Sequence, residues 1–484
     1  MFFRNKYNFN VAIKILTPNK LLSIIILFQI IVFVFLYKNG LLTSPDLYTS
    51  DAYSFYHNNY SNLENLLSQY RSFGGPLYVK FYKIFSLELK NWGMVNYILF
   101  SISLILFFHS LILNNFNKIF SFFLILGILG STKLWYYFSY WSEVFSVTLI
   151  LFTTSLYFFS YKYKKNYQYF LFTIFLFYTY QVRPLFVIFV FTFILLEFYF
   201  IKFDKKEKIF NIKNLKIANF TLLPLIFFLI IRYSITGHLG IAPYVGAHVG
   251  AHALFYLNEN NINLSSEKNK DFAKKIYKRK LAHNYPCNSD YSEIKELSSY
   301  TLCYTENTMS LMLEMIKDKT NKQPFKDGDE RNYNSWKYMI TLDKFFIEIK
   351  NYNEIDKSLQ NFSEYLIKLN FKNFLNQAKL NFYKSYSMQV SMNKKLIYIY
   401  IITIIILFSI FLINKKSILK SKDDLIKLNG ILIFFLLTNF LSIIILSVIH
   451  LPKMRLMSVQ GIFFVPVIFS YIIGYLTNIF ENKK

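Results

Sequence analysis

Long apolar stretches, separated by short polar segments, recur along most of the chain. A helix rises about 1.5 Å per residue and the hydrocarbon core of a bilayer is roughly 30 Å thick, so about 17 to 25 apolar residues can cross it. The pattern therefore predicts an all-α polytopic membrane protein with about ten transmembrane helices. They cover approximately residues 21–37, 95–113, 118–133, 144–161, 167–182, 184–201, 217–233, 396–413, 429–449 and 458–478.

One apolar stretch, residues 167–203, is too long for a single span, and Arg183 and Pro184 interrupt it near the middle. Proline disfavours helix in the residue before it, and an arginine buried in lipid is costly. We therefore expect two helices joined by a tight turn at the outer membrane surface.

The hydrophilic residues divide the chain into three parts. Residues 1–233 form an N-terminal transmembrane module, residues 234–395 a large extracytoplasmic loop domain between the seventh and eighth helices, and residues 396–484 the C-terminal transmembrane helices. Lys and Arg gather before residue 21 and in residues 162–165, 202–216 and 415–427. Short cytoplasmic loops retain such residues. The pattern predicts a multi-pass protein of the plasma or inner membrane, with both termini cytoplasmic and residues 38–94 as the first outer loop.

The net charge of +26 would suggest a nucleic-acid partner in a soluble protein. Here 54% of the residues are hydrophobic, and the basic excess follows from membrane topology and attraction to anionic lipid head groups. We expect membrane lipid, not nucleic acid, as a partner. The first apolar stretch is followed by many more, so we interpret it as an anchor and not as a cleaved signal.

Two features of the loop domain each allow two interpretations. Cys287 and Cys303 are the chain's two cysteines, and they either pair in an oxidising outer compartment, which could contribute about 3 kcal/mol, or remain free buried thiols. Leu359, Phe362 and Leu366 recur at helical spacing and predict an amphipathic helix. This helix either lies on the membrane surface or packs against the rest of the loop domain.

Charged residues from distant parts of the sequence fall on the predicted outer side. Charges beside a bilayer are costly unless they are paired or used, so their convergence indicates a site. A carboxylate in the first outer loop, Asp46 or Asp51, can act as a general base, although either can instead cap a loop helix. The arginines at helix ends can bind an anion or extend to the membrane surface. The candidates are Asp46, Asp51, Arg71, Glu143, Arg183, Lys453 and Arg455.

Short motifs surround these residues. They are Ser50-Asp51-Ala52-Tyr53, Gly74-Gly75-Pro76-Leu77-Tyr78, Trp141-Ser142-Glu143, Arg183-Pro184 and Pro452-Lys453-Met454-Arg455. They resemble motifs of the membrane-embedded class C glycosyltransferases, the superfamily that includes protein O-mannosyltransferases and aminoarabinose transferases. The resemblance covers mainly residues 21–240 and a short piece near residue 455. The first motif departs from the family's pattern, because serine stands at the first place of the family's acidic pair.

The resemblance implies an enzyme that moves a sugar from a polyprenyl-phosphate-linked donor to an acceptor hydroxyl of a glycan, lipid or protein at the outer face. Asp51 would be the general base, with Asp46 and Glu143 as further catalytic candidates. The leaving group is an anionic phosphate, whose developing charge a cation must stabilise. Arg183, Arg455, Arg71 and Lys453 are the candidates to bind it, and Arg matches phosphate oxygens better than Lys does.

His248 and His252 stand four residues apart in a glycine-containing segment. On a helix they would share a face and could bind a divalent metal. Because glycine disfavours helix, we instead favour a flexible loop that contacts the donor phosphate or closes over the site. A divalent metal stays the less favoured alternative, and the sequence indicates no other cofactor.

Two other functions remain open. A polysaccharide polymerase or ligase, of the O-antigen type, has a similar arrangement but does not require an acid in the first outer loop. A lipid-carrier flippase or other transporter needs polar groups deep within its spans. The sequence contains no glycine-rich phosphate loop, which argues against a nucleotide-driven pump.

Overall fold

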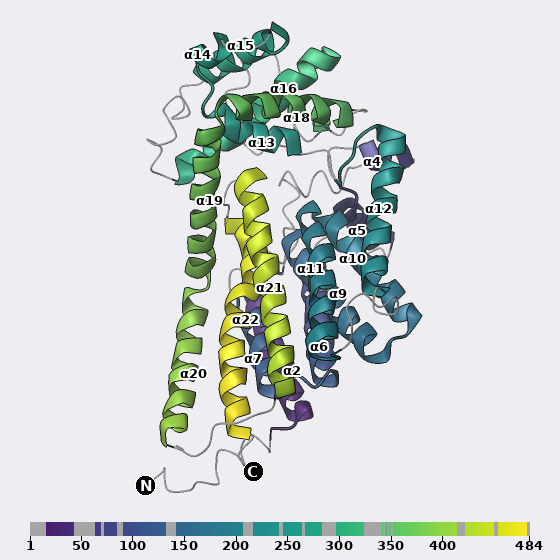
Figure 1. Ribbon diagram of the computed structural model, residues 1–484, viewed down its shortest axis with the longest axis vertical. Coiled ribbons are helices and arrows are strands. Elements are labelled where there is room, and N and C mark those ends of the chain that lie inside the picture. The colour runs from purple at the N-terminus through teal and green to yellow at the C-terminus, as the bar shows by residue number, and fades with distance from the viewer. Residues whose placement is uncertain are drawn as a thin grey trace.

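The computed structural model is built from helices, and the residues that it describes include no strand (Figure 1). The described residues are 16–42, 63–68, 72–84, 91–131, 142–206, 216–241, 245–263, 267–282, 297–323, 341, 344–346, 348–349, 352–413, 422–449 and 454–481.

Ten of the helices in the described ranges coincide with the ten apolar stretches predicted to span the membrane. Six segments are long and apolar enough to cross a membrane within the described ranges, and α19 and α20 together form a further candidate that is bent by 67°. The coinciding helices are α2 (Pro18–Lys38), α6 (Trp92–Leu113), α7 (Lys118–Leu129), α9 (Ser142–Tyr163), α10 (Asn166–Val182), α11 (Ile188–Phe203), α12 (Lys216–Thr236), α20 (Lys394–Ile413), α21 (Lys422–Ile449) and α22 (Met454–Glu481).

The predicted break inside residues 167–203 is confirmed. Helix α10 ends at Val182, Arg183 has an extended backbone, and a short 3-10 helix, η2 (Pro184–Val187), leads into α11. Proline is well tolerated at the first position of η2, because a backbone N–H there would have no hydrogen-bond acceptor within the helix.

The long helices pack into a bundle with an aromatic interior and an apolar outside. Phe193 of α11 contacts Phe434 of α21 with ring centroids 4.8 Å apart. Leu27 and Ile30 of α2 are exposed, as expected of side chains that face lipid tails. The buried carboxylate of Glu197 accepts hydrogen bonds from Tyr157 and Lys205, which offsets the cost of removing its charge from water.

A helical cap lies over one end of the bundle, at the top of Figure 1, and has a hydrophobic core of its own. The apolar face of α18 is buried in this core, where Phe362 contacts Phe272 of α15 with ring centroids 4.8 Å apart. The amphipathic helix therefore packs against the rest of the loop domain, the second of the two predicted alternatives. The cap consists of α13 (Val245–Leu254), α14 (Glu259–Asn263), α15 (Glu267–Ala282), α16 (Leu297–Thr320) and α18 (Tyr352–Leu369).

Cys303 of α16 is fully buried and takes part in a disulfide. Cys287, the chain's other cysteine, lies outside the described residues.

Helix α19 (Phe371–Met392) connects the cap to α20 and packs along α21 and α22. Its buried side carries polar residues at every fourth position. The Gln389 and Asn439 carboxamides donate to each other over 2.8 and 3.0 Å, which joins α19 to the middle of α21. The hydrophilic pattern predicted this segment as part of the loop domain, residues 234–395, and gave no sign of this contact. The polar residues are Gln377, Asn381, Ser385, Gln389 and Asn393.

Candidate functional site

The candidate site lies where α5 (Gly74–Ile84) meets the end of α10. The Tyr178 hydroxyl donates to the carbonyl oxygen of Gly74 over 2.9 Å. A methyl group on Gly74 would lie 2.6 Å from the carbonyl oxygen of Gln181, closer than a real Cβ approaches such an atom. Glycine is therefore required for the two backbones to come this close.

The start of α9 joins this contact through an aromatic stack. The rings of Tyr78 in α5 and Phe145 in α9 are nearly parallel, with centroids 3.7 Å apart. The Tyr78 hydroxyl donates to the side-chain oxygen of Asn96 in α6 over 2.7 Å. Val182 belongs to the same buried cluster. Helices α5, α6, α9 and α10 are thereby fixed to one another at this end of the bundle.

Glu143 and Arg183 form an ion pair at this junction. Glu143 lies in the first turn of α9 and is fully buried, whereas the side chain of Arg183 keeps 14% of its exposure. A carboxylate at this depth needs a cation partner, because removing an unpaired charge from water is costly. The helix N-terminus also favours an acid in the first turn. Two of the predicted site residues, 40 positions apart in sequence, are thus in direct contact.

The other predicted charged residues are only partly covered by the structure. Asp46, Asp51, Arg71 and Lys453 lie outside the described residues. Arg455 lies in the first turn of α22, but its side chain is not among those described.

His248 and His252 lie on helix α13, so the prediction of a flexible loop is wrong. The glycines do not break this helix, since they allow it to pack closely on α18. A methyl group on Gly246 would lie 2.6 Å from the Gln360 backbone nitrogen. Close packing in the cap therefore outweighs the low helix propensity of glycine. Within the described ranges, no group of three His, Cys, Asp or Glu side chains could hold a metal.

Both histidines contact Tyr304 of α16, and the contact extends to the bundle. Nδ1 of His248 lies 2.6 Å from the Tyr304 hydroxyl, which donates to the carbonyl oxygen of Ile449 over 3.1 Å. The His252 ring lies 4.8 Å from the Tyr304 ring, centroid to centroid. Ile449 ends α21, so these cap residues lie beside the last turn of that helix.

The last turn of α21 links this cluster to the Arg183 junction. Leu185, two residues after Arg183, packs against a cluster formed by Leu446 of α21 with Met388 and Met392 of α19, and η2 contacts α21. Leu446 and Ile449 are three residues apart, so their backbones are separated by about 5 Å along the helix axis. The Glu143–Arg183 pair and the His248–Tyr304 pair therefore lie at the same end of the bundle.

A second buried polar junction was not predicted from the sequence. Arg232, near the end of α12, is 1% exposed and donates to the Gly240 carbonyl over 2.6 Å and to the Asn353 side chain over 2.9 Å. Asn353 also donates to the carbonyl oxygen of Leu67 in α4 (Leu63–Ser68), a helix of the first predicted outer loop. This junction ties that loop to the cap. The sequence signal that could have indicated this junction is the position of Arg232 near the end of an apolar stretch.

Asp356 of α18 extends the junction. Its carboxylate accepts hydrogen bonds from the His238 ring over 3.1 Å, from the Gly246 backbone over 3.0 Å and from the Gln360 side chain over 2.7 Å. These bonds satisfy a fully buried acid and hold α13 against α18.

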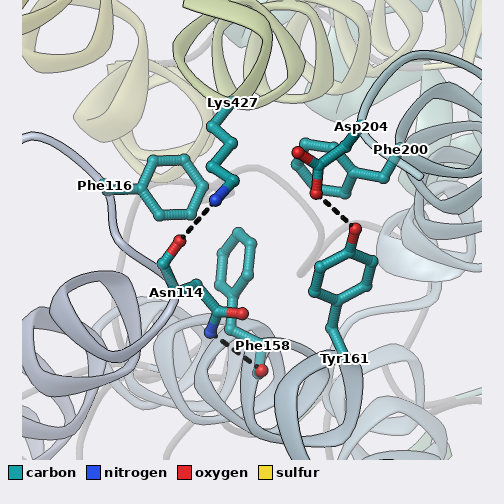
Figure 2. Close-up of a pocket in the computed structure, with 7 residues that line it drawn as sticks. All are labelled: Asn114, Phe116, Phe158, Tyr161, Phe200, Asp204 and Lys427. Atoms are coloured by element: carbon teal, nitrogen blue, oxygen red, sulfur yellow. Dashed lines mark hydrogen bonds between the residues drawn. The ribbon is translucent and has the colours of Figure 1, made fainter. Parts of the chain in front are cut away.

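A small pocket with about 170 Å³ of empty space lies at the opposite end of α9 (Figure 2). Lys427 donates to the Asn114 carbonyl over 3.1 Å, and the Tyr161 hydroxyl donates to Asp204 over 2.7 Å. Because Tyr161 follows Glu143 by 18 residues, about 27 Å of helix separates this pocket from the candidate site. The pocket therefore forms no part of that site.

No protein-family model, curated protein or solved structure matches this chain.

Proposed function

We propose that the protein is a glycosyltransferase of the membrane-embedded class C type, which moves a sugar from a polyprenyl-phosphate-linked donor to an acceptor hydroxyl at the outer membrane face. The observation that carries this proposal is the meeting of three motifs that are distant in sequence. Gly74 packs against the end of α10, Tyr78 stacks on the start of α9, and Glu143 pairs with Arg183. Their convergence at one end of the bundle supports a shared site.

Arg183 is the donor-phosphate ligand that this geometry supports best. A guanidinium has five N–H donors, and one carboxylate accepts at most two of them in a fork. Glu143 fixes the orientation of the Arg183 side chain, whose planar guanidinium matches the geometry of phosphate oxygens. Glu143 is thus a positioning residue, so Asp51 remains the proposed base, with Asp46 as the substitute. Arg455, Arg71 and Lys453 are further proposed phosphate ligands.

In the proposed reaction the acceptor oxygen attacks the anomeric carbon of the sugar. The bond from that carbon to the phosphate oxygen breaks, and the phosphate leaves with the electron pair. The proton of the acceptor hydroxyl passes to the Asp51 carboxylate. Arginine stabilises the charge that develops on the phosphate, so the enzyme binds the transition state more tightly than the donor.

The proposed topology has ten spans, cytoplasmic termini and an outward-facing cap. The disulfide at Cys303 supports an outward cap, because disulfides persist in oxidising compartments. The described ends of α9, α10 and α21 that approach the cap also match the outer side given by the distribution of Lys and Arg.

The test is transfer of labelled sugar from a panel of polyprenyl-phosphate sugars by the purified full-length protein. We expect Asp51→Asn to abolish turnover, because an amide cannot accept the proton. Asp318→Asn is the matched control, since Asp318 is an exposed cap residue paired with Lys275. Normal turnover by the Asp51 variant would contradict its assignment as the base. Wild-type protein that is folded yet inactive with every donor would contradict the glycosyltransferase proposal.

A lipid-carrier flippase is the second candidate, favoured by the buried polar side of α19. A flippase moves the carrier across the bilayer without breaking the sugar–phosphate bond. Movement of intact donor in proteoliposomes, with no free carrier phosphate formed, would favour this candidate.

A further inference from the structure

Gln181 is a buried polar residue at the centre of the candidate site. Its side chain is fully buried, yet neither its amide nitrogen nor its carbonyl oxygen has a hydrogen-bond partner in the part of the chain that the structure describes. Its neighbour Thr179 shows the usual alternative, because the Thr179 hydroxyl bonds the hydroxyl of Thr153 and the carbonyl oxygen of Phe175.

A buried carboxamide without partners lowers the stability of the folded protein. Proteins pair the large majority of such groups, so each exception needs an explanation, such as a catalytic role or a bound water or ion. An apolar side chain of similar size, such as methionine, would pack at this position without that cost. A glutamine at this position therefore points to a partner beyond the residues that the structure describes.

Gln181 lies at the proposed sugar-transfer site, so a partner bound to its side chain would also lie there. Gln181 follows Tyr178 by three residues, so both lie on the face of α10 that meets α5. Gly74 of α5 contacts the Gln181 backbone, and Arg183, the proposed phosphate ligand, follows two residues later. Gln181 and the proposed phosphate ligand therefore belong to the same short segment at the end of α10.

We propose that Gln181 recognises a hydroxyl group of the donor sugar, an assignment that rests on the proposed glycosyltransferase function. A carboxamide offers both a donor and an acceptor, and a hydroxyl group needs both to be fully satisfied. A phosphate oxygen would use the donor alone and leave the Gln181 oxygen unpaired. The sugar is the part of the donor that carries hydroxyl groups next to its phosphate.

The test compares binding of a bare polyprenyl phosphate with binding of the same lipid carrying a hexose, an N-acetylhexosamine or a deoxyhexose. Full-length wild-type protein, Gln181→Met and the control Thr179→Val are measured in lipid nanodiscs. We expect Gln181→Met to bind the preferred sugar-bearing lipid about tenfold more weakly, the size of one lost hydrogen bond, and to bind the bare lipid as before. Thr179→Val should keep the wild-type preference.

Thermal unfolding of the ligand-free proteins is the second measurement. Gln181→Met should raise the unfolding temperature, since it removes unpaired buried polar atoms, and Thr179→Val should lower it. Higher stability together with weaker sugar binding is a combination that a purely structural glutamine would not produce.

The outcomes separate this inference from the proposed function. A wild-type preference for a sugar-bearing lipid that Gln181→Met retains would overturn the role of Gln181 and leave the proposed function intact. Equal binding of all lipids by the wild type would overturn both. A lower unfolding temperature of ligand-free Gln181→Met would show that the chain itself satisfies the carboxamide, which also overturns the inference.

Discussion

The Tyr304 hydroxyl donates its single hydrogen to the carbonyl oxygen of Ile449. Because that hydrogen is used, the 2.6 Å contact with His248 requires Nδ1 of His248 to donate to the Tyr304 oxygen. One hydroxyl therefore joins α13, α16 and the last turn of α21. The Tyr304 hydroxyl thus holds the cap against the end of α21.

Removing this hydroxyl should loosen the cap from the bundle. Tyr304→Phe leaves the Ile449 carbonyl and the His248 ring without this partner, and we expect a loss of about 1–3 kcal/mol of stability. Thermal unfolding of the purified protein measures the effect. Tyr383→Phe is the control, since Tyr383 is 60% exposed on α19, and it should change little. Equal unfolding temperatures for Tyr304→Phe and wild type would contradict the proposed link.

Breaking the Glu143–Arg183 pair should be more costly. Glu143→Gln leaves Arg183 without its charged partner in a largely buried site, and we expect a loss of about 3–5 kcal/mol. Lys275→Gln breaks the exposed pair with Asp318, for which about 0–1 kcal/mol is expected. Denaturant or thermal unfolding distinguishes the two values. Similar small effects for both variants would show that Glu143 does not depend on Arg183.

A methyl group at Gly74 should separate α5 from α10. Gly74→Ala forces the backbone of α5 away from the Gln181 carbonyl, at a cost of about 1–3 kcal/mol typical of overpacking. We also expect sugar transfer to fall, since the converging motifs lose their contact. Gly130→Ala is the control with a smaller expected effect, because a methyl group there would lie 3.0 Å from the Leu126 carbonyl oxygen, whereas at Gly74 the nearest backbone atoms are 2.4 Å away. Full activity of Gly74→Ala would show that sugar transfer does not require close packing of α5 on α10.

Membrane topology can be tested at two exposed residues. A single cysteine at position 318 in the cap should react with an impermeant maleimide added outside intact cells. A single cysteine at position 165, between α9 and α10, should react only after the cells are opened. Both positions are exposed, so a lack of labelling would not result from burial. Labelling of both from the same side would refute the proposed orientation.

The ten long helices that coincide with apolar stretches could be predicted from the sequence, because most of these stretches have polar residues at their ends. The break at Arg183 was predictable for the same reason: proline restricts the residue before it. Helix α13 was not predictable, since the low helix propensity of Gly246 is offset by packing on α18, more than a hundred residues later. Local sequence carries no information about that contact.

Part of the candidate site could also be predicted. Glu143 and Arg183 were assigned to one side from charge topology, but topology gives no distance, and their ion pair required the structure. Arg232 and Asn353 were missed because their contact joins residues 121 positions apart. A single arginine near the end of an apolar stretch also fits a side chain that extends to the membrane surface.

The polar side of α19 has a consequence for the order in which the protein is made. The ribosome produces Gln389 fifty residues before Asn439, its partner on α21. An unpaired carboxamide is costly in hydrocarbon. We therefore expect helix α19 to take its final place against the bundle only after α21 has been made, late in synthesis.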